Sequence, residues 1–203
     1  MPIITYVIVG IVVLISLQGF NSKEFIYKMS FSPYLVKHQN QFSRFFTQMF
    51  IHADMGHLFF NMFSFYSLGS YMEMALKYTY GDVLGGIHFT VLFLAGGLFA
   101  TLWPYVRNQD NENYHSLGAS GAVSAVIFAF VMWSPGEELL IFFFPMKAYI
   151  FGPLYLIFEY FAFRRGKGNV AHDAHIGGAI FGIIYILIIN IDKGKDFVNQ
   201  IIN

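Results

Sequence analysis

Long apolar runs separated by short polar segments make up most of this chain, and they limit its possible folds more than any other feature. A helix that crosses the hydrocarbon core of a bilayer needs about 20 mainly apolar residues. Runs close to this length recur along the 203 residues. Backbone polar groups cannot stay unpaired in lipid, so each run is expected to be helical. The chain is therefore expected to be an all-α polytopic membrane protein.

Six membrane spans are expected from the apolar runs and the turn residues between them. The expected spans cover residues 3–20, 56–77, 83–103, 118–133, 148–163 and 174–189. Proline lacks the backbone N–H of a helix interior, so Pro104 is expected to stop the third span. Residues 139–144 are apolar but too short to span, and a short polar tail follows the sixth span. These features predict a single membrane domain over residues 1–203, with both termini on one side.

The segment at 21–46 mixes basic residues with many aromatic ones, which is typical of a segment lying at the membrane interface. Together with the segments at 104–117 and 164–170, it carries eight of the twelve lysines and arginines. All three segments face the side opposite the termini in a six-span chain. The positive-inside tendency therefore weighs against cytoplasmic termini, and charge alone does not set the orientation.

Composition excludes several classes of partner. Charged residues make up 12% of the chain, against about 25% in soluble domains. The net charge is +0, and no basic stripe indicates a nucleic-acid partner. The chain has no cysteine, which rules out disulfides and thiolate metal sites. The lipid bilayer is the expected surrounding.

Polar side chains inside the expected spans fall at only a few positions, and such groups are functional candidates because they are costly in lipid. The second span opens with His57, and Asn61 and Ser64 follow on the same helix face. The fourth span carries Ser120 near its start, and the sixth carries His175 near its start. Alternate spans run parallel, so these groups are expected to lie at one depth.

Glycines beside the histidine of the sixth span predict close helix packing. Gly178 and Gly182 lie on the face of His175, and small residues spaced four apart let membrane helices approach closely. Close packing of the fourth and sixth spans would bring the imidazole within hydrogen-bonding reach of the Ser120 hydroxyl. A weak hydroxyl nucleophile needs that activation.

At these residues the chain resembles the rhomboid intramembrane serine proteases. The resemblance covers essentially all six expected spans, and a six-span chain of this kind is similar to the minimal bacterial form of the family. It rests on three motifs in chain order, which are His57-x-x-x-Asn61, Gly118-Ala119-Ser120-Gly121 and Ala174-His175-x-x-Gly178-x-x-x-Gly182. Arg44 and Glu73 also fall where the family has structural polar residues.

The resemblance implies a Ser-His dyad that cleaves transmembrane segments of membrane-protein substrates without any cofactor or metal. Ser120 would attack the scissile carbonyl, and His175 would act as general base and then as acid. An oxyanion hole would be formed by His57, Asn61 and the Ser120 backbone N–H, with Gly118 keeping the preceding loop tight. No aspartate is needed to orient the histidine. The implied location is a bacterial inner membrane.

Three positions depart from the family pattern. The residue four after the serine is often an aromatic ring that stacks on the catalytic histidine, and here it is Ser124. The Trp-Arg pair of the first loop reads Ser43-Arg44, and His172 stands where some members have asparagine. The support of His175 must then come from other packing or from a hydrogen bond.

Other functions remain open at this level. A Gly-x-Ser-Gly stretch on its own is more often a helix-packing device, and His57 and Asn61 would also suit hydrogen bonds between helices. A rhomboid-like protein that binds membrane clients without cutting them is the main alternative. A transporter is a further alternative, but it would more typically show paired discontinuous helices in two repeated halves.

The remaining histidines and acids invite a metal site or a full triad. His52, His57, His172 and His175 match no zinc motif by their spacing, and Asp54 and Asp173 complete no recognised ligand set. His52 and Gln48 are expected to bond loop or water at the interface. Asp173 is expected to cap the sixth span rather than to face His175, since residues two apart on a helix point in different directions.

Overall fold

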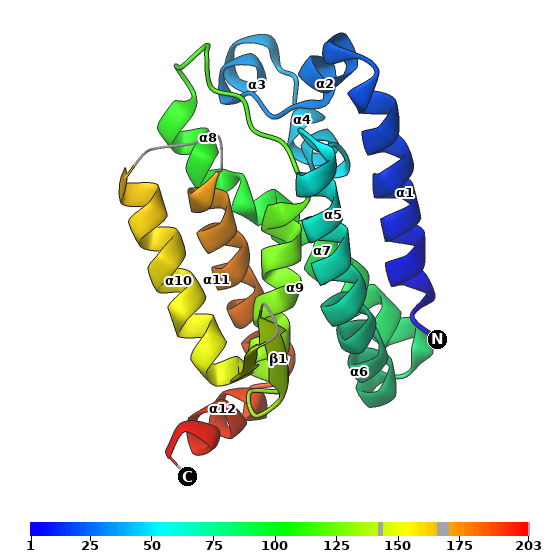
Figure 1. Ribbon diagram of the computed structural model, residues 1–203, viewed down its shortest axis with the longest axis vertical. Helices are drawn as coiled ribbons and strands as arrows, with labels where there is room; N and C mark the ends of the chain where they lie inside the picture. The colour runs from blue at the N-terminus through cyan, green and yellow to red at the C-terminus, as the bar shows by residue number, and fades with distance from the viewer. Residues whose placement is uncertain (142–143, 166–170, 203) are drawn as a thin grey trace.

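The computed structural model describes residues 1–141, 144–165 and 171–202. Of the basic loop expected at 164–170, residues 164–165 end α10 and residues 166–170 lie outside the described residues. The described chain is mostly helical (Figure 1). The elements before the central helix are α1 (Ile3–Phe20), α2 (Lys23–Met29), α3 (Pro33–Gln39), α4 (Arg44–Thr47), η1 (Gln48–Phe50), α5 (Met55–Ser64), η2 (Phe65–Gly69), α6 (Ser70–Tyr80), α7 (Asp82–Ala100) and α8 (Leu102–Asn108). The later elements are α9 (Ser120–Trp133), β1 (Glu138–Ile141), β2 (Phe144–Lys147), α10 (Ala148–Arg165), α11 (His172–Ile189) and α12 (Asp192–Ile202).

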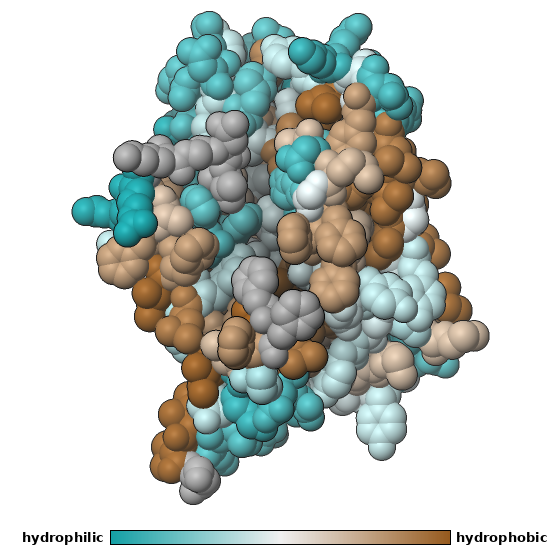
Figure 2. All heavy atoms as spheres, viewed as in Figure 1, coloured by the Kyte–Doolittle hydropathy of each residue, from teal (hydrophilic) through white to brown (hydrophobic). Residues whose placement is uncertain are grey.

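Three helical stretches of the described chain are long and apolar enough to cross a membrane. They are Ile3–Phe20, Asp82–Asn108 and His172–Ile189. The other three expected spans also coincide with helices, but α9 is shorter, α10 is less apolar, and the second expected span is divided between α5, η2 and α6. Figure 2 shows hydrophilic side chains gathered at the upper end of the molecule and hydrophobic ones along its flanks, as a membrane protein requires.

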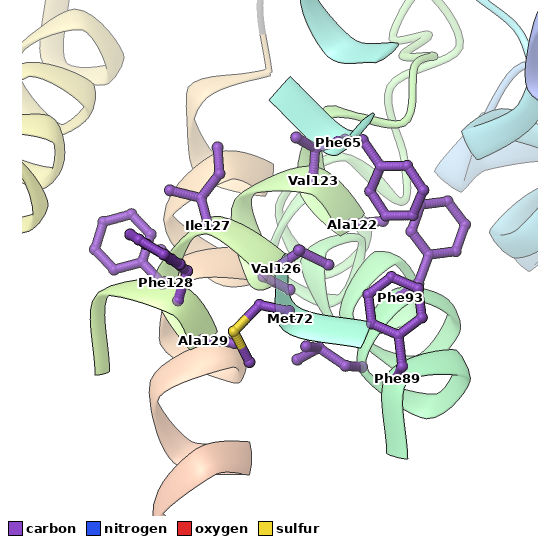
Figure 3. Close-up of a cluster of buried hydrophobic side chains, with 14 of the residues drawn as sticks. Phe65, Met72, Phe89, Phe93, Ala122, Val123, Val126, Ile127, Phe128 and Ala129 are labelled. Carbon is purple, nitrogen blue, oxygen red and sulfur yellow. The ribbon is translucent and has the colours of Figure 1, made fainter. Parts of the chain in front are cut away.

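The core forms around α9, which lies at the centre of the bundle and contacts α11, α7, α10 and α5 (Figure 1). From Gly121 to Trp133 every residue of this helix is buried. Figure 3 shows Val126 and Phe128 of α9 in the same cluster as Phe65 and Phe93 from neighbouring elements. A helix that is apolar on every face is expected to be buried on every face.

Glycine allows α11 to contact α9 at the backbone. A methyl group on Gly178 would overlap the carbonyl oxygen of Gly121, and one on Gly182 would overlap the carbonyl oxygen of Ala125. This packing is the close approach expected from the spacing of the small residues.

The second expected span is one continuous helical stretch containing a π-helical turn, η2. The turn directs Phe65 and Gly69 into the core. The extra residue of a π-turn rotates the helix that follows it. The side chains of α6 therefore point in directions rotated from those that α5 would give if it continued as a regular α-helix.

Buried polar groups anchor the ends of the bundle. Glu73 accepts hydrogen bonds from the backbone N–H of Ile4 and of Thr5 and pairs with Lys77 at 2.5 Å, which fixes the start of α1. At the other end the buried Arg44 donates to the carbonyl oxygens of Tyr27 and Ser30. Both residues have the structural role that the resemblance implied.

Several expectations were wrong. Pro104 does not stop the third span, because it lies in the first turn of α8, where a missing N–H costs no hydrogen bond. The break comes at Thr101, between α7 and α8. The short polar tail forms the helix α12. The chain is mostly helical, as expected, and the strands β1 and β2 add one antiparallel pair to the all-α fold expected. Asp173 lies within α11 and does not cap it: the N-cap residue is Ala171.

Candidate functional site

Ser120 is the first residue of α9, at the end of a loop held by the N-terminal half of the chain. The backbones of Ser116 and Phe31 exchange two hydrogen bonds of 2.8 and 3.0 Å. The N–H of Gly118 donates to the carbonyl oxygen of Gln48 at 2.9 Å, and the N–H of Ala119 donates to Nε2 of His52 at 3.2 Å. These four hydrogen bonds, at Ser116, Gly118 and Ala119, leave the turn before Ser120 little freedom.

Gly118 has a backbone conformation that side chains disfavour, with φ at +123°. A methyl group here would lie 2.6 Å from Cε1 of His57. The imidazole of His57 therefore packs directly on the loop that precedes Ser120.

His52 is fully buried beneath this loop. Its Nε2 accepts from Ala119, so the ring proton lies on Nδ1, which faces Oγ of Ser16 at 3.0 Å. Burial, followed by the charge of the neighbouring His57, lowers the pKa of His52 to about 3. The ring is therefore a neutral structural group. The expected bond between His52 and the loop is confirmed.

His57 and Asn61 occupy the start of α5. Asp54 caps this helix by accepting from the N–H of His57 at 2.8 Å. The His57 ring stands edge-on to His52, 4.9 Å away. Asn61 is buried one turn further along, and its Nδ2 donates to the His57 carbonyl at 2.9 Å. Both residues lie on the side of α5 that faces the Ser120 loop.

His175 lies in the first turn of α11. The backbone of α11 meets that of α9 at Gly178 and Gly121, and the carbonyl of Ala174 lies on the other side of Gly121. His175 is also close enough to His57 for their charges to interact. Ser120 Oγ has no hydrogen bond to another residue in the described part of the chain. The structure therefore brings the two helix starts together without closing a Ser–His hydrogen bond, as is common in unliganded active sites.

The sequence reasoning missed Glu159, a buried carboxylate on α10. Its Oε2 lies 2.6 Å from Nδ1 of His172, and its Oε1 lies 3.1 Å from Nδ1 of His175. The signal was present, because Glu159 is the one charged residue in the expected span 148–163. A charged group inside a span calls for a functional explanation.

The same three residues form the set best suited to hold a metal ion among the residues that the structure describes. One donor atom each from Glu159, His172 and His175 lies within 4.8 Å of the others. The sequence analysis found no zinc motif among His52, His57, His172 and His175, and His52 is bonded to Ser16 and Ala119 instead.

Comparisons with known proteins agree with these motifs. Residues 39–191 match the model of the Rhomboid domain. The chain is similar to the presenilin-associated rhomboid-like protein, mitochondrial, of Bos taurus, with 31% identity over 141 residues that cover 68% of this chain and 35% of the relative. It is also similar to RHOMBOID-like protein 12, mitochondrial, of Arabidopsis thaliana, with 29% identity covering 68% of this chain and 44% of the relative. The chain thus spans less than half the length of these relatives.

Proposed function

Since the chain belongs to the rhomboid family, we propose that it is an intramembrane serine endopeptidase that cleaves transmembrane segments of membrane proteins. Ser120 is the nucleophile and His175 is the general base. The observation that carries the proposal is the position of the Ser120 turn, which lies between the His57 ring and the start of α11.

The proposed reaction follows from the position of each group. His175 takes the proton of Ser120 Oγ as this oxygen attacks the scissile carbonyl, and then gives it to the leaving amine. The first N–H groups of a helix have no intrahelical partner, so the Ser120 N–H at the start of α9 is free to donate to the oxyanion. His57 and Asn61 supply the side-chain donors. Water then hydrolyses the acyl-enzyme.

The hydrogen bonds that hold the loop preorganise the oxyanion hole. An oxyanion donor is effective only when its position is fixed before the charge develops. The bonds from Gly118 to Gln48 and from Ala119 to His52 fix the backbone immediately before Ser120. No cofactor enters this mechanism.

The proposed architecture is the six-span bundle, with α5, η2 and α6 together forming the second span. Membrane integration follows from the family and from the apolar helices. The relatives named above are mitochondrial proteins, so they lend no support to the bacterial inner membrane expected from the sequence. Proteolysis needs water. The helices α5 and α11 begin toward the upper end of the molecule in Figure 1, and Figure 2 shows hydrophilic side chains gathered at that end.

Cleavage of a transmembrane substrate by the reconstituted protein tests the proposal. We expect the wild type to cut the substrate, and Ser120→Ala and His175→Ala each to abolish cutting while the protein remains folded. A fluorophosphonate probe is expected to label the wild type at Ser120. Full activity in either variant would contradict the proposed Ser–His dyad. A folded wild type that binds the substrate without cutting or labelling would favour a client-binding rhomboid-like protein.

A further inference from the structure

A buried carboxylate faces the proposed catalytic histidine from a neighbouring helix. Glu159 is 4% exposed, and its ion-pair partners among the described residues are the two imidazoles of α11. A charge this deeply buried is costly unless it is paired. The carboxylate is therefore held by His172 and His175, and not by a lysine or arginine.

The two carboxylate oxygens have different partners. Oε2 has a 2.6 Å hydrogen bond to Nδ1 of His172, which holds the carboxylate in one orientation. Oε1 is left facing Nδ1 of His175 at 3.1 Å. The distance is that of an ion pair, but the angle at His175 falls outside hydrogen-bond geometry, so this buried nitrogen has no hydrogen-bond partner in the structure. Rotation of the ring is needed to align the bond.

We propose that Glu159 is the third member of the site and that it positions His175, an inference that rests on the Ser–His dyad proposed above. Nδ1 of His175 carries a proton and faces the carboxylate, which leaves Nε2 free to accept the proton of Ser120. When His175 becomes an imidazolium, its contact with Glu159 becomes a charge-assisted bond. The transferred proton passes from Ser120 Oγ to Nε2 and on to the leaving amine, while the Nδ1 proton stays in place and Glu159 stays ionised.

The same helix accounts for the serine at position 124. Tyr155 lies one turn before Glu159 on the same face of α10, and its hydroxyl bonds to Oγ of Ser124 at 3.1 Å. A bulky ring at 124 would occupy the space that Tyr155 fills. Support of His175 therefore comes from α10 through Glu159, where an aromatic residue on α9 would otherwise supply it.

A purely structural role for Glu159 makes a different prediction. If the carboxylate only joins α10 to α11, its loss lowers stability and leaves the turnover of the folded protein unchanged. If it positions His175 and stabilises the imidazolium, its loss lowers turnover and the reactivity of Ser120 in protein that is still folded. Substrate binding is expected to be unaffected in the second case, because the buried Glu159 acts through His175.

Glu159→Gln keeps the size of the side chain and removes its charge, and Glu159→Asp keeps the charge. In proteoliposomes with a fluorogenic transmembrane substrate, we expect Glu159→Gln to lower kcat about 10- to 100-fold, with KM within about twofold. Fluorophosphonate labelling of Ser120 should slow in parallel, and Glu159→Asp should recover part of both rates. Glu138→Gln is the matched control, since Glu138 is exposed on β1 and pairs with Lys147.

Three results would overturn the inference. They are a kcat for Glu159→Gln within twofold of wild type, a change in KM alone, or a loss matched in Glu159→Asp and explained by unfolding. If Glu159→Gln does not fold, the kcat and labelling rate of Glu159→Asp decide: values equal to those of the wild type would overturn the inference, because the shorter carboxylate is withdrawn from Nδ1 of His175. An active wild type that needs Ser120 and His175 but not Glu159 would overturn this inference alone. A wild type that neither cuts nor labels would overturn the proposed protease as well.

Discussion

The imidazole of His52 accepts a hydrogen bond from the backbone N–H of Ala119, at 3.2 Å, directly before the proposed nucleophile. The other ring nitrogen faces Oγ of Ser16, which in turn donates to the carbonyl of Phe50 at 3.2 Å. Two hydrogen bonds thus link the Ser120 loop to α1 through His52, and a third joins α1 to η1. The shape of the active-site turn depends on contacts with the first helix of the chain.

Replacing His52 with leucine is expected to destabilise the protein and to lower its activity. The change leaves the buried Ala119 N–H without its partner, at a cost of about 1–3 kcal/mol. It also removes one of the two hydrogen bonds of the Ser16 hydroxyl, which keeps its bond to the Phe50 carbonyl. Thermal unfolding in detergent and cleavage of a transmembrane substrate measure the two effects. His38→Leu, at an exposed position of α3, is the control. Wild-type stability in His52→Leu would show that these bonds contribute nothing.

Acid is expected to destabilise the protein through His52. The pKa of His52 is about 3 in the folded protein, against an ordinary value of 6.5, so the unfolded chain binds the additional proton between these values. The free energy of unfolding is therefore unaffected by His52 titration above about pH 6.5. As the pH decreases from 6.5 toward 3, it falls by up to about 1.4 kcal/mol per pH unit. Unfolding measured from pH 7 to pH 4 should show this slope. His52→Leu should flatten it, and an unchanged slope would assign the effect to other groups.

The positions of the helices could be predicted because apolar run length is a property of the sequence alone. The proximity of His57 to the Ser120 loop could also be predicted, because parallel spans place their starts at one depth. The π-turn at 65–69 and the helix α8 that follows Thr101 could not, since both depend on how neighbouring side chains pack.

Glu159 shows why part of the site escaped prediction. Its partners lie 13 and 16 residues away on another helix, and the relative rotation of α10 and α11 decides whether they meet. No local sequence pattern predicts the relative rotation of these two helices. The general rule that a charge inside a span is functional singles out Glu159, but only the fold shows that it faces His175.

Gly178→Ala is expected to separate α9 from α11 and to reduce activity. The added methyl would overlap the carbonyl oxygen of Gly121, which belongs to the backbone and cannot rotate away. Overpacking of this kind costs about 1–3 kcal/mol. Gly10→Ala is the matched control, because a methyl there meets no atom within 4 Å. Thermal unfolding and substrate cleavage should both be impaired in the first variant and not in the second. Equal behaviour of the two variants would contradict the close packing.

Added Zn²⁺ is expected to inhibit the protein, whereas a chelator such as EDTA should leave the activity unchanged. The proposed mechanism uses no metal, but donor atoms of Glu159, His172 and His175 lie within 4.8 Å of one another. A zinc ion bound there would occupy Nδ1 of His175 and break its contact with Glu159. Cleavage measured over a range of Zn²⁺ concentrations should give a saturable loss of activity.

The variant His172→Gln distinguishes zinc inhibition at this site from nonspecific inhibition by zinc. The variant loses one of the three ligands, so the fraction of its activity that a given Zn²⁺ concentration removes should be smaller than in the wild type. His38→Gln, which changes an exposed histidine of α3, should be inhibited like the wild type. Equal inhibition of His172→Gln and the wild type would place the zinc elsewhere, and loss of activity with EDTA would contradict a metal-free mechanism.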